Sequence, residues 1–194
     1  MANILGGPSP IDAGSMGEGF FTDYAKKFMH DPAGFGMFMH QKKLADIISA
    51  WNCGAADGLM SYDAIYLAGG HGTCTDFADN KTLKSAIEGM LAAGKVVAAD
   101  CHGPIALAQC SKPDGSPLVQ GLCVTGFCDS EEAAVGQTGN VPFLIETKFK
   151  ELGAKYEKAA DWNPKASVDG NLVTGQNPQS SEACAKAVIA KFKK

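Results

Sequence analysis

One segment of the sequence is the most informative about the architecture of this chain: Val96-Val97-Ala98-Ala99-Asp100-Cys101-His102-Gly103-Pro104. Its first four residues are small or β-branched and apolar, which is typical of a strand buried on both faces. A short helix is expected to begin at Gly103-Pro104 and to end near Gln109. A strand that runs straight into a helix is the basic unit of an open α/β sheet. The stretch therefore predicts that Cys101 and His102 lie at the carboxyl end of a sheet strand.

Strands and helices alternate from Tyr62 to the C-terminus. We expect two further strands over 63–68 and 123–127, and two more over 166–168 and 172–174 joined in a hairpin by Asp169-Gly170. Helices are expected over 81–93, capped by Asp79 or Asn80 and ended by Gly94, from Pro142 to Gly153, and over 180–193 with Phe192 facing inward. This alternation predicts a mainly parallel sheet with helices on both faces.

Residues 15–52 differ from the rest because they are rich in aromatic residues and methionine at helical spacing. One helix is indicated by Phe20, Tyr24 and Phe28, and it ends at Asp31-Pro32. A second helix has Leu44, Ile47, Ile48 and Trp51 on one face. We expect a small helical cap without strands. Phe35, Met37, Phe38 and Met39 either pack inward in this cap or line an entrance to the site.

The composition of the 194-residue chain limits the functions it can have. Hydrophobic residues make up 45% and charged residues 20%, so the chain can bury a core and is not a disordered tail. The formal net charge is -4, with only 17 lysine and arginine residues, which argues against a nucleic acid or an anionic membrane surface as partner. The length suits one domain over 1–194, with 15–52 as an insertion.

The cysteine pattern and the absence of long apolar runs indicate the cellular compartment in which this protein is expected. No stretch approaches the ~20 apolar residues of a membrane-spanning helix. Gly6-Gly7-Pro8 also interrupts the N-terminus before the apolar region of a secretory signal. The seven cysteines form no Cys-x-x-Cys pair, and four of them, Cys101, Cys110, Cys123 and Cys184, lie in apolar or small-residue runs. We expect a protein of the reducing cytoplasm.

The histidines and cysteines show no pattern typical of a metal site. The four histidines, His30, His40, His71 and His102, have no ligand spacing on one predicted element, and the cysteines lack zinc-ligand spacing. We therefore expect neither a metal nor a cofactor.

Cys101 occupies the position of a nucleophile. A sharp turn from strand to helix exposes one side chain at the top of a sheet, and the N–H groups at the start of the helix lower the pKa of a thiol. We expect the His102 ring to reach this thiol and its N–H to face a developing oxyanion. A second N–H donor is expected from Gly70 or His71, after the neighbouring strand. The alternative is a buried small residue beside a capping histidine.

A histidine base needs a carboxylate to orient it. The segment Thr125-Gly126-Phe127-Cys128-Asp129-Ser130-Glu131-Glu132 follows the expected strand over 123–127, at the same edge of the sheet. Asp129, Glu131 and Glu132 are all eligible, and their spacing does not choose among them.

Five segments in order resemble the PfpI superfamily, in its branch of glyoxalase III enzymes and related heat-shock chaperones. They are YDAIYLAGGHGT (62–73), GKVVAADCHGP (94–104), PLVQGLCVTGF (117–127), EEAAVGQTGNVPFLIE (131–146) and DGNLVTGQNPQSS (169–181). The resemblance implies a flavodoxin-like three-layer α/β sandwich, usually dimeric. It places the nucleophile on Cys101, the histidine on His102, the third carboxylate on Glu132, and the oxyanion amides near Gly70 and His102.

Two features depart from the family pattern. Family members normally begin with a strand, a helix and a second strand before a segment like GGPSPID, and a glutamate of that unit hydrogen-bonds the nucleophilic sulfur. No residue here matches that glutamate, so we expect the sequence to be part of a longer protein. A second chain that fills the gap, or a degenerate relative, are the alternatives. Asp100 stands where relatives carry an apolar residue, and it either replaces the missing acid or points to the opposite face.

The resemblance and the motifs together imply a glutathione-independent glyoxalase that converts methylglyoxal to lactate through a cysteine hemithioacetal. Deglycase and chaperone activities are overlapping possibilities within the same branch. Two other hypotheses stay open: an impaired relative that acts as an oxidation-sensing, chaperone-like or structural subunit, and a cysteine hydrolase. The expected partner is a small 2-oxoaldehyde, and the expected assembly is a homodimer or a complex with a chain that supplies the missing strands.

Overall fold

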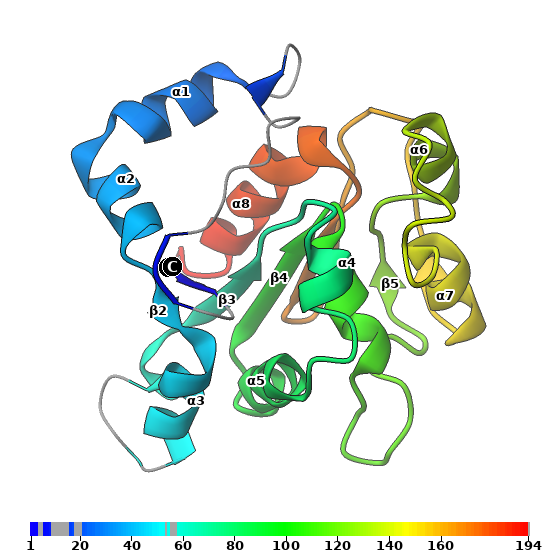
Figure 1. The fold of residues 1–194 in the computed structure, drawn as a ribbon. Helices are drawn as coiled ribbons and strands as arrows, with labels where there is room; N and C mark the ends of the chain where they lie inside the picture. Colours follow the sequence, from blue (N-terminus) through cyan, green and yellow to red (C-terminus); the bar gives the residue numbers. More distant parts are fainter. Residues whose placement is uncertain (4–5, 9–15, 18–20, 53, 55–57, 194) are drawn as a thin grey trace. The chain divides into compact units, whose positions relative to one another are not determined.

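The computed structural model describes residues 1–194 except 4–5, 9–15, 18–20, 53, 55–57 and 194. The chain divides into two compact units, Met1–Ser61 and Tyr62–Lys194 (Figure 1). Within the described residues, no helix is long and apolar enough to cross a bilayer.

The first unit contains the two helices that the spacing of its apolar residues predicts, α1 (Asp23–His30) and α3 (Leu44–Asn52). A further helix, α2 (Pro32–Met39), was not predicted, and the 3-10 turn η2 (Leu59–Ser61) follows α3. Asp31 separates α1 from α2 because its carboxylate accepts the N–H groups of Ala33 and Gly34 and so starts a new helix. Phe20 lies outside the described residues.

The expectation that 15–52 contains no strand is wrong. Strand β2 (Lys42–Lys43) pairs in parallel with β1 (Ala2–Asn3). Both lysine side chains are exposed, so this strand has no apolar alternation, and only backbone hydrogen bonding reveals it. Leu44, Ile47 and Ile48 of α3 are buried, as their shared face predicts.

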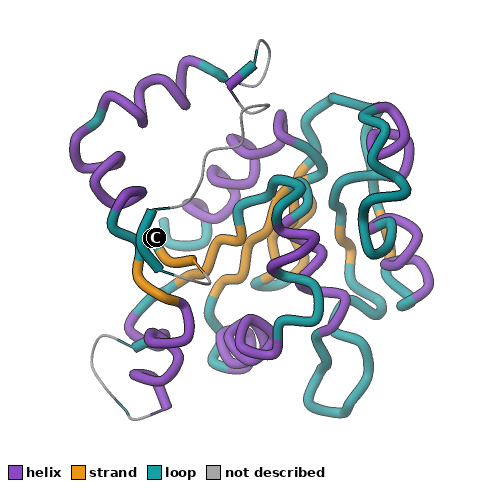
Figure 2. Tube along the Cα trace, viewed as in Figure 1, coloured by secondary structure: helices purple, strands orange, loops and turns teal. Residues whose placement is uncertain are grey.

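A four-stranded sheet forms the centre of the second unit. Its order is β3 (Ala64–Leu67), β4 (Val96–Asp100), β8 (Leu172–Gly175) and β7 (Ala166–Asp169). The first three strands are parallel and lie side by side (Figure 2), whereas β7 and β8 form the expected antiparallel hairpin. The predicted α/β fold with a mainly parallel sheet is therefore confirmed.

Strand β4 is the centre of this sheet, and all five of its residues are buried. Val96 and Ala98 pack with Val173 against Cys184 of α8 (Ser181–Ala190). Because side chains alternate along a strand, Val97 and Ala99 face the opposite side. The helix α5 (Lys81–Ala92) contacts β4 and buries Leu83, Ala86, Ile87 and Met90. Its N-cap is Asn80, whose side chain accepts the N–H of Leu83.

The strand expected over 123–127 is only partly correct. β5 covers Cys123–Val124 and pairs with β6 (Lys155–Tyr156) in a separate two-stranded sheet. It stops there because the N–H of Thr125 donates to the side chain of Thr174 at 2.9 Å rather than to a strand backbone. This side-chain bond ties the 123–127 segment to β8.

Four short helices complete the second unit: α4 (Thr73–Asp76), η3 (Gly103–Gln109), α6 (Asp129–Ala134) and α7 (Ile145–Glu151), and the turn η4 (Pro178–Ser180) precedes α8. Two expectations are wrong in detail. The helix expected from Pro142 begins at Ile145. Phe192, expected to face inward, is 50% exposed because α8 ends two residues earlier, at Ala190.

Candidate active site

Cys101 lies in a tight turn between β4 and η3. Its backbone φ is +55°, a left-handed conformation that costs a residue with a side chain roughly 1–3 kcal/mol. Hydrogen bonds on both sides fix this conformation. The Cys101 N–H donates to the carbonyl of Gly175 at 2.9 Å, and the Cys101 carbonyl accepts the N–H of Phe127 at 2.8 Å. The turn is therefore held by β8 on one side and by the 123–127 segment on the other.

Two glycines allow the ends of β3 and β4 to touch. A Cβ atom on Gly69 would lie 2.6 Å from both the Asp100 carbonyl oxygen and the Cys101 Cβ. A Cβ atom on Gly103 would collide with the Leu67 carbonyl oxygen. Only glycine fits at either position, so the 69–70 segment lies directly against the Cys101 turn.

The side chains of Cys101, His102 and Glu132 form a continuous hydrogen-bonded chain. The Cys101 Sγ lies 3.4 Å from the His102 Nδ1, and the His102 Nε2 lies 2.7 Å from the Glu132 Oε2. An ionised carboxylate only accepts hydrogen bonds, so Nε2 carries the imidazole proton. Nδ1 then has a free lone pair directed at the sulfur. This is the tautomer that a base requires to take the thiol proton.

Glu132 also binds a second imidazole, that of His71. The His71 Nε2 lies 2.7 Å from the Glu132 Oε1, and the two imidazole ring centroids are 4.0 Å apart. Burial alone raises the pKa of Glu132, but the hydrogen bonds from His102 and His71 outweigh it and leave the pKa below its usual value. The carboxylate is therefore ionised at neutral pH. The predicted role of His71 was limited to its backbone N–H. The signal for its side chain is a histidine directly after Gly-Gly at a neighbouring strand end.

The backbone N–H groups of Gly70 and His102 lower the pKa of the Cys101 thiol, as hydrogen-bond donors near a sulfur do. They come from adjacent strand ends and are two of the expected oxyanion donors. The N–H of His71, the third expected donor, is not among the groups that lower this pKa.

The start of the helix does not give Cys101 the low thiol pKa that the sequence predicts. Burial raises the pKa of the Cys101 thiol to about 12, and the charge of Asp100 acts in the same direction. The N–H groups of Gly70 and His102 lower it, but by less. Cys101 is only 8% exposed, which the strand-to-helix pattern does not reveal. The resting thiol is therefore protonated.

Asp129 and Glu131, the other two eligible carboxylates, have different partners. Asp129 accepts the hydroxyl of Thr147 at 2.6 Å. Glu131 is fully buried and accepts the N–H of Trp162 and the side-chain amide of Asn177, each at 2.8 Å. Among these three carboxylates, only Glu132 hydrogen-bonds His102.

Asp100 is directed at β3 and α8 rather than at the sulfur. Its carboxylate accepts the N–H of Gly69 at 3.1 Å and the hydroxyl of Ser181, and it hydrogen-bonds the Tyr66 hydroxyl. Burial raises the pKa of Asp100 in spite of these partners. The arrangement does not support replacement of the missing acid by Asp100.

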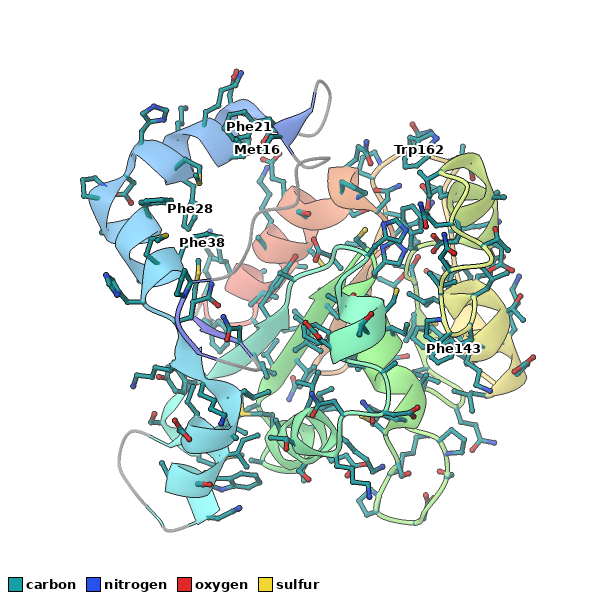
Figure 3. The ribbon with its side chains drawn as sticks, viewed as in Figure 1. Met16, Phe21, Phe28, Phe38, Phe143 and Trp162 are labelled. Atoms are coloured by element: carbon teal, nitrogen blue, oxygen red, sulfur yellow. The ribbon has the colours of Figure 1, made fainter. Side chains whose placement is uncertain are left out.

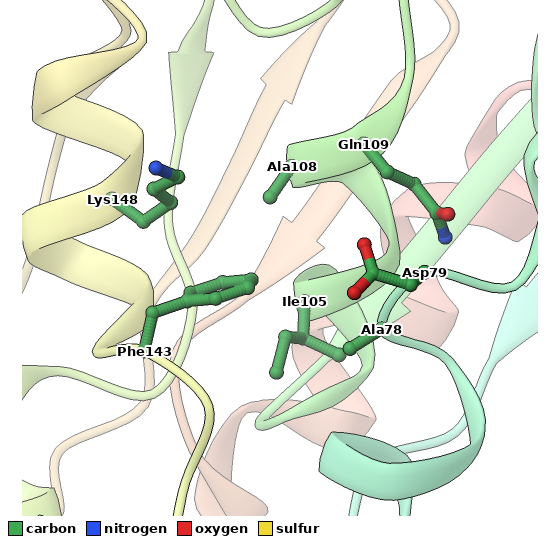
Figure 4. A pocket seen from close by; sticks show the side chains of 7 residues that line it. All are labelled: Ala78, Asp79, Ile105, Ala108, Gln109, Phe143 and Lys148. Atoms are coloured by element: carbon green, nitrogen blue, oxygen red, sulfur yellow. The ribbon is translucent and has the colours of Figure 1, made fainter.

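Aromatic rings cover the imidazole of His102. The Phe127 ring centroid lies 4.2 Å from that of His102. Trp162, which is labelled in Figure 3, packs edge-on against Phe127 at 5.9 Å. A small pocket of about 110 Å³ lies on a different part of η3 (Figure 4). It is lined by Ala78, Asp79, Ile105, Ala108, Gln109, Phe143 and Lys148, and it contains neither Cys101 nor His102.

One group of side chains has the donor atoms of a metal site. A nitrogen of His71, a nitrogen of His102 and an oxygen of Glu132 all lie within 4.8 Å of one another. Residue spacing does not indicate this group, because its three members come from three separate segments.

Comparisons with known proteins place this geometry in a family. The model of the DJ-1/PfpI family matches residues 52–191. Glyoxalase 3 of Candida albicans is 36% identical over 137 residues, which are 68% of this chain and 58% of the relative. The glutathione-independent glyoxalase HSP31 of Saccharomyces cerevisiae is 35% identical over 139 residues, with the same two coverages. The chain thus spans less than two thirds of the length of these curated relatives.

Solved structures agree with the fold. The Rapid Encystment Protein 24 KDa of Francisella tularensis has a TM-score of 0.87 and 34% identity, over 100% of this chain and 80% of that protein. Glyoxalase III of Candida albicans has a TM-score of 0.80 and 29% identity, over 95% of this chain and 76% of that protein. With its flavodoxin-like α/β fold and the family model matched over 52–191, this chain belongs to the DJ-1/PfpI family.

Proposed function

We propose that this chain carries the catalytic centre of a glutathione-independent glyoxalase, which converts a 2-oxoaldehyde such as methylglyoxal to the 2-hydroxy acid. The observation that carries the proposal is the chain from the Cys101 Sγ through His102 to Glu132, with the N–H groups of Gly70 and His102 at the sulfur. Relatives that are 33–36% identical are named glyoxalases of this kind.

The first step is addition of the thiol to the aldehyde carbon. The proton leaves the Cys101 Sγ for the His102 Nδ1 as the S–C bond forms, and the aldehyde oxygen becomes an alkoxide near the N–H groups of Gly70 and His102. A pKa near 12 makes free ionisation at pH 7 cost about 7 kcal/mol. Proton transfer to His102 during the attack avoids a free thiolate. Glu132 stabilises the imidazolium that forms.

The second step moves hydrogen between the two carbons. His102 returns its proton to the alkoxide and gives the hemithioacetal. An imidazole nitrogen then takes the proton from the former aldehyde carbon and gives it to the ketone oxygen, which produces an enediol. The hydroxyl on the former aldehyde carbon next loses its proton to the imidazole, and the imidazolium protonates the former ketone carbon, which leaves a thioester on Cys101. Water hydrolyses this thioester to the 2-hydroxy acid and the free thiol, so no net oxidant or reductant is needed.

The test is formation of lactate from methylglyoxal without added thiol. We expect Cys101→Ser to abolish turnover and Glu132→Gln to lower kcat by about 10²-fold or more, because His102 loses the carboxylate that fixes its tautomer. Cys123→Ser and Glu146→Gln are the matched controls, since both residues lie outside the hydrogen-bonded chain. Equal lactate formation by wild type and Cys101→Ser would refute the proposal.

The alternatives make different predictions. A peroxide sensor needs a reactive thiolate, and the raised pKa of Cys101 argues against that role. A cysteine hydrolase would use the same three side chains, and cleavage of ester or amide substrates in place of methylglyoxal would identify it. A deglycase or chaperone activity accompanies the glyoxalase in this proposal. Removal of early glycation adducts would detect the deglycase activity. Suppression of client aggregation by Cys101→Ser, which we expect to lack glyoxalase turnover, would detect the chaperone activity.

The assembly and the compartment remain predictions. The proposed homodimer is tested by sedimentation of the purified protein, and the cytoplasmic location by fractionation. A monomer at micromolar concentration would contradict the first, and recovery outside the cytoplasm would contradict the second.

A further inference from the structure

Glu132 connects a buried imidazole to a half-exposed one. Its side chain is 4% exposed, that of His102 is 2% exposed, and that of His71 is 42% exposed. Each carboxylate oxygen lies 2.7 Å from the Nε2 of one of the two rings. His71 is therefore the member of this group that is exposed to solvent, and the sulfur lies on the Nδ1 side of the His102 ring.

The three donors are those that zinc prefers. Two imidazole nitrogens and one carboxylate form the protein ligands of several zinc sites, with water as the fourth ligand. In a tetrahedral site with metal–ligand distances near 2.1 Å, neighbouring donors lie roughly 3.3 Å apart. The present contacts of 2.7 Å, one to each carboxylate oxygen, would open by roughly 0.6 Å, and the half-exposed His71 can accommodate this movement.

We propose that Zn²⁺ binds the Nε2 atoms of His71 and His102 and the carboxylate of Glu132, and that this binding switches off the Cys101 nucleophile. The metal takes the Nε2 lone pair of each ring, so each ring proton moves from Nε2 to Nδ1 and no proton is lost. The His102 Nδ1–H then donates toward the Cys101 Sγ, 3.4 Å away, and has no lone pair to accept the thiol proton. The inhibition rests on the proposed glyoxalase function; the metal site itself does not.

Cys101 is the competing ligand. Thiolates are strong zinc ligands, and the sulfur is close to His102. However, it faces the Nδ1 of that ring rather than the Nε2, so a metal on Nε2 of both rings is not also on the sulfur.

Co²⁺ substitution tests the donor set without reference to activity. We expect the wild-type protein with Co²⁺ to show visible d–d absorption and no sulfur-to-cobalt charge-transfer band. The Cys101→Ser variant should give the same spectrum. A charge-transfer band that disappears in Cys101→Ser would overturn the proposed ligand set.

Zn²⁺ titration calorimetry tests the role of His71. We expect one Zn²⁺ per chain in the wild type and at least tenfold weaker binding in His71→Asn, since even indirect ligand partners commonly contribute 10–100-fold. His40→Asn, at an exposed histidine of the first unit, is the matched control and should bind like wild type. Equal affinities in wild type and His71→Asn, or no binding by the wild type, would overturn the site.

Turnover of methylglyoxal at increasing Zn²⁺ then tests the inhibition. We expect the wild type to lose activity at the concentration at which calorimetry shows binding, and to regain it with EDTA. His71→Asn, scored relative to its own rate without metal, should need at least tenfold more Zn²⁺. Saturated binding with unchanged wild-type turnover would refute the inhibition but leave the site. If no preparation turns over methylglyoxal, the proposed function fails, and the cobalt spectrum still decides the site.

Discussion

Gly69→Ala is the substitution that the structure predicts to be most damaging to the Cys101 turn. The added Cβ would lie 2.6 Å from the Asp100 carbonyl oxygen, 2.6 Å from the Cys101 Cβ and 3.0 Å from the His102 nitrogen. Two of these atoms belong to the backbone, and the third is the first carbon of the side chain that carries the sulfur. No flexible side chain can move aside, so the two strand ends must separate.

The cost can be estimated from this geometry. Overpacking of a tight interior typically costs 1–3 kcal/mol, and collision with backbone places Gly69→Ala near about 3 kcal/mol. For a protein of this length, 1 kcal/mol corresponds to about 2–4 °C in Tm, so we expect a loss of about 6–12 °C. The separation also moves the Gly70 N–H away from the sulfur. Because misplacement by 1 Å can cost 10²-fold in rate, we expect kcat to fall at least tenfold.

Gly72→Ala is the matched control in the same loop. A Cβ on Gly72 meets nothing within 4 Å, and its φ of -54° suits any residue. Thermal unfolding followed by circular dichroism and lactate formation from methylglyoxal are measured for both variants. We expect Gly72→Ala to stay within about 0.5 kcal/mol of wild type. If both variants had the same Tm and turnover, the close contact between the strand ends would not be what holds the site.

Three further changes have defined outcomes. Asp100→Asn removes a negative charge that adds to burial in raising the pKa of Cys101, so the pKa falls, and iodoacetamide alkylation at Cys101, followed by peptide mass analysis, accelerates at neutral pH. Glu146→Gln, which loses the Lys150 bond, should cost about 1–3 kcal/mol in urea unfolding. Burial raises the pKa of Glu146, but its hydrogen bonds outweigh burial and lower the pKa. The difference in unfolding free energy between wild type and Glu146→Gln should therefore shrink as pH falls through that pKa. Asn80→Ala should cost about 1 kcal/mol by the same urea assay.

The parts of the fold that the sequence predicts correctly are those whose signals are local. Val96–Ala99 is continuous and apolar, and it is the central strand. Asn80 and Gly94 mark the ends of α5, because capping depends on a few neighbouring atoms. β2 is different: two exposed lysines form a strand only because a segment about forty residues earlier pairs with them. Pairing between distant segments cannot be predicted from the apolar pattern of either segment alone.

The candidate site divides in the same way. Cys101 and His102 are adjacent in sequence, and the strand-to-helix turn that exposes them is local. Spacing alone left Asp129, Glu131 and Glu132 equivalent, and the family resemblance pointed to Glu132, which is the one that contacts His102. The His71 side chain was missed because its bond to Glu132 joins residues 61 positions apart. The protonated state of the thiol was missed because burial is a property of the whole unit.

Asp100 shows why the site works against a resting thiolate. Its carboxylate accepts the Gly69 N–H and so holds the segment whose next N–H, that of Gly70, lies near the sulfur. The same charge raises the pKa of the neighbouring Cys101 thiol. One residue thus improves the position of an oxyanion donor and makes the nucleophile harder to ionise. These effects are compatible only if the proton leaves the sulfur late, as the aldehyde carbon approaches and His102 accepts it. Asp100, which departs from the family pattern, therefore favours a Cys101 thiolate that forms only as the substrate approaches.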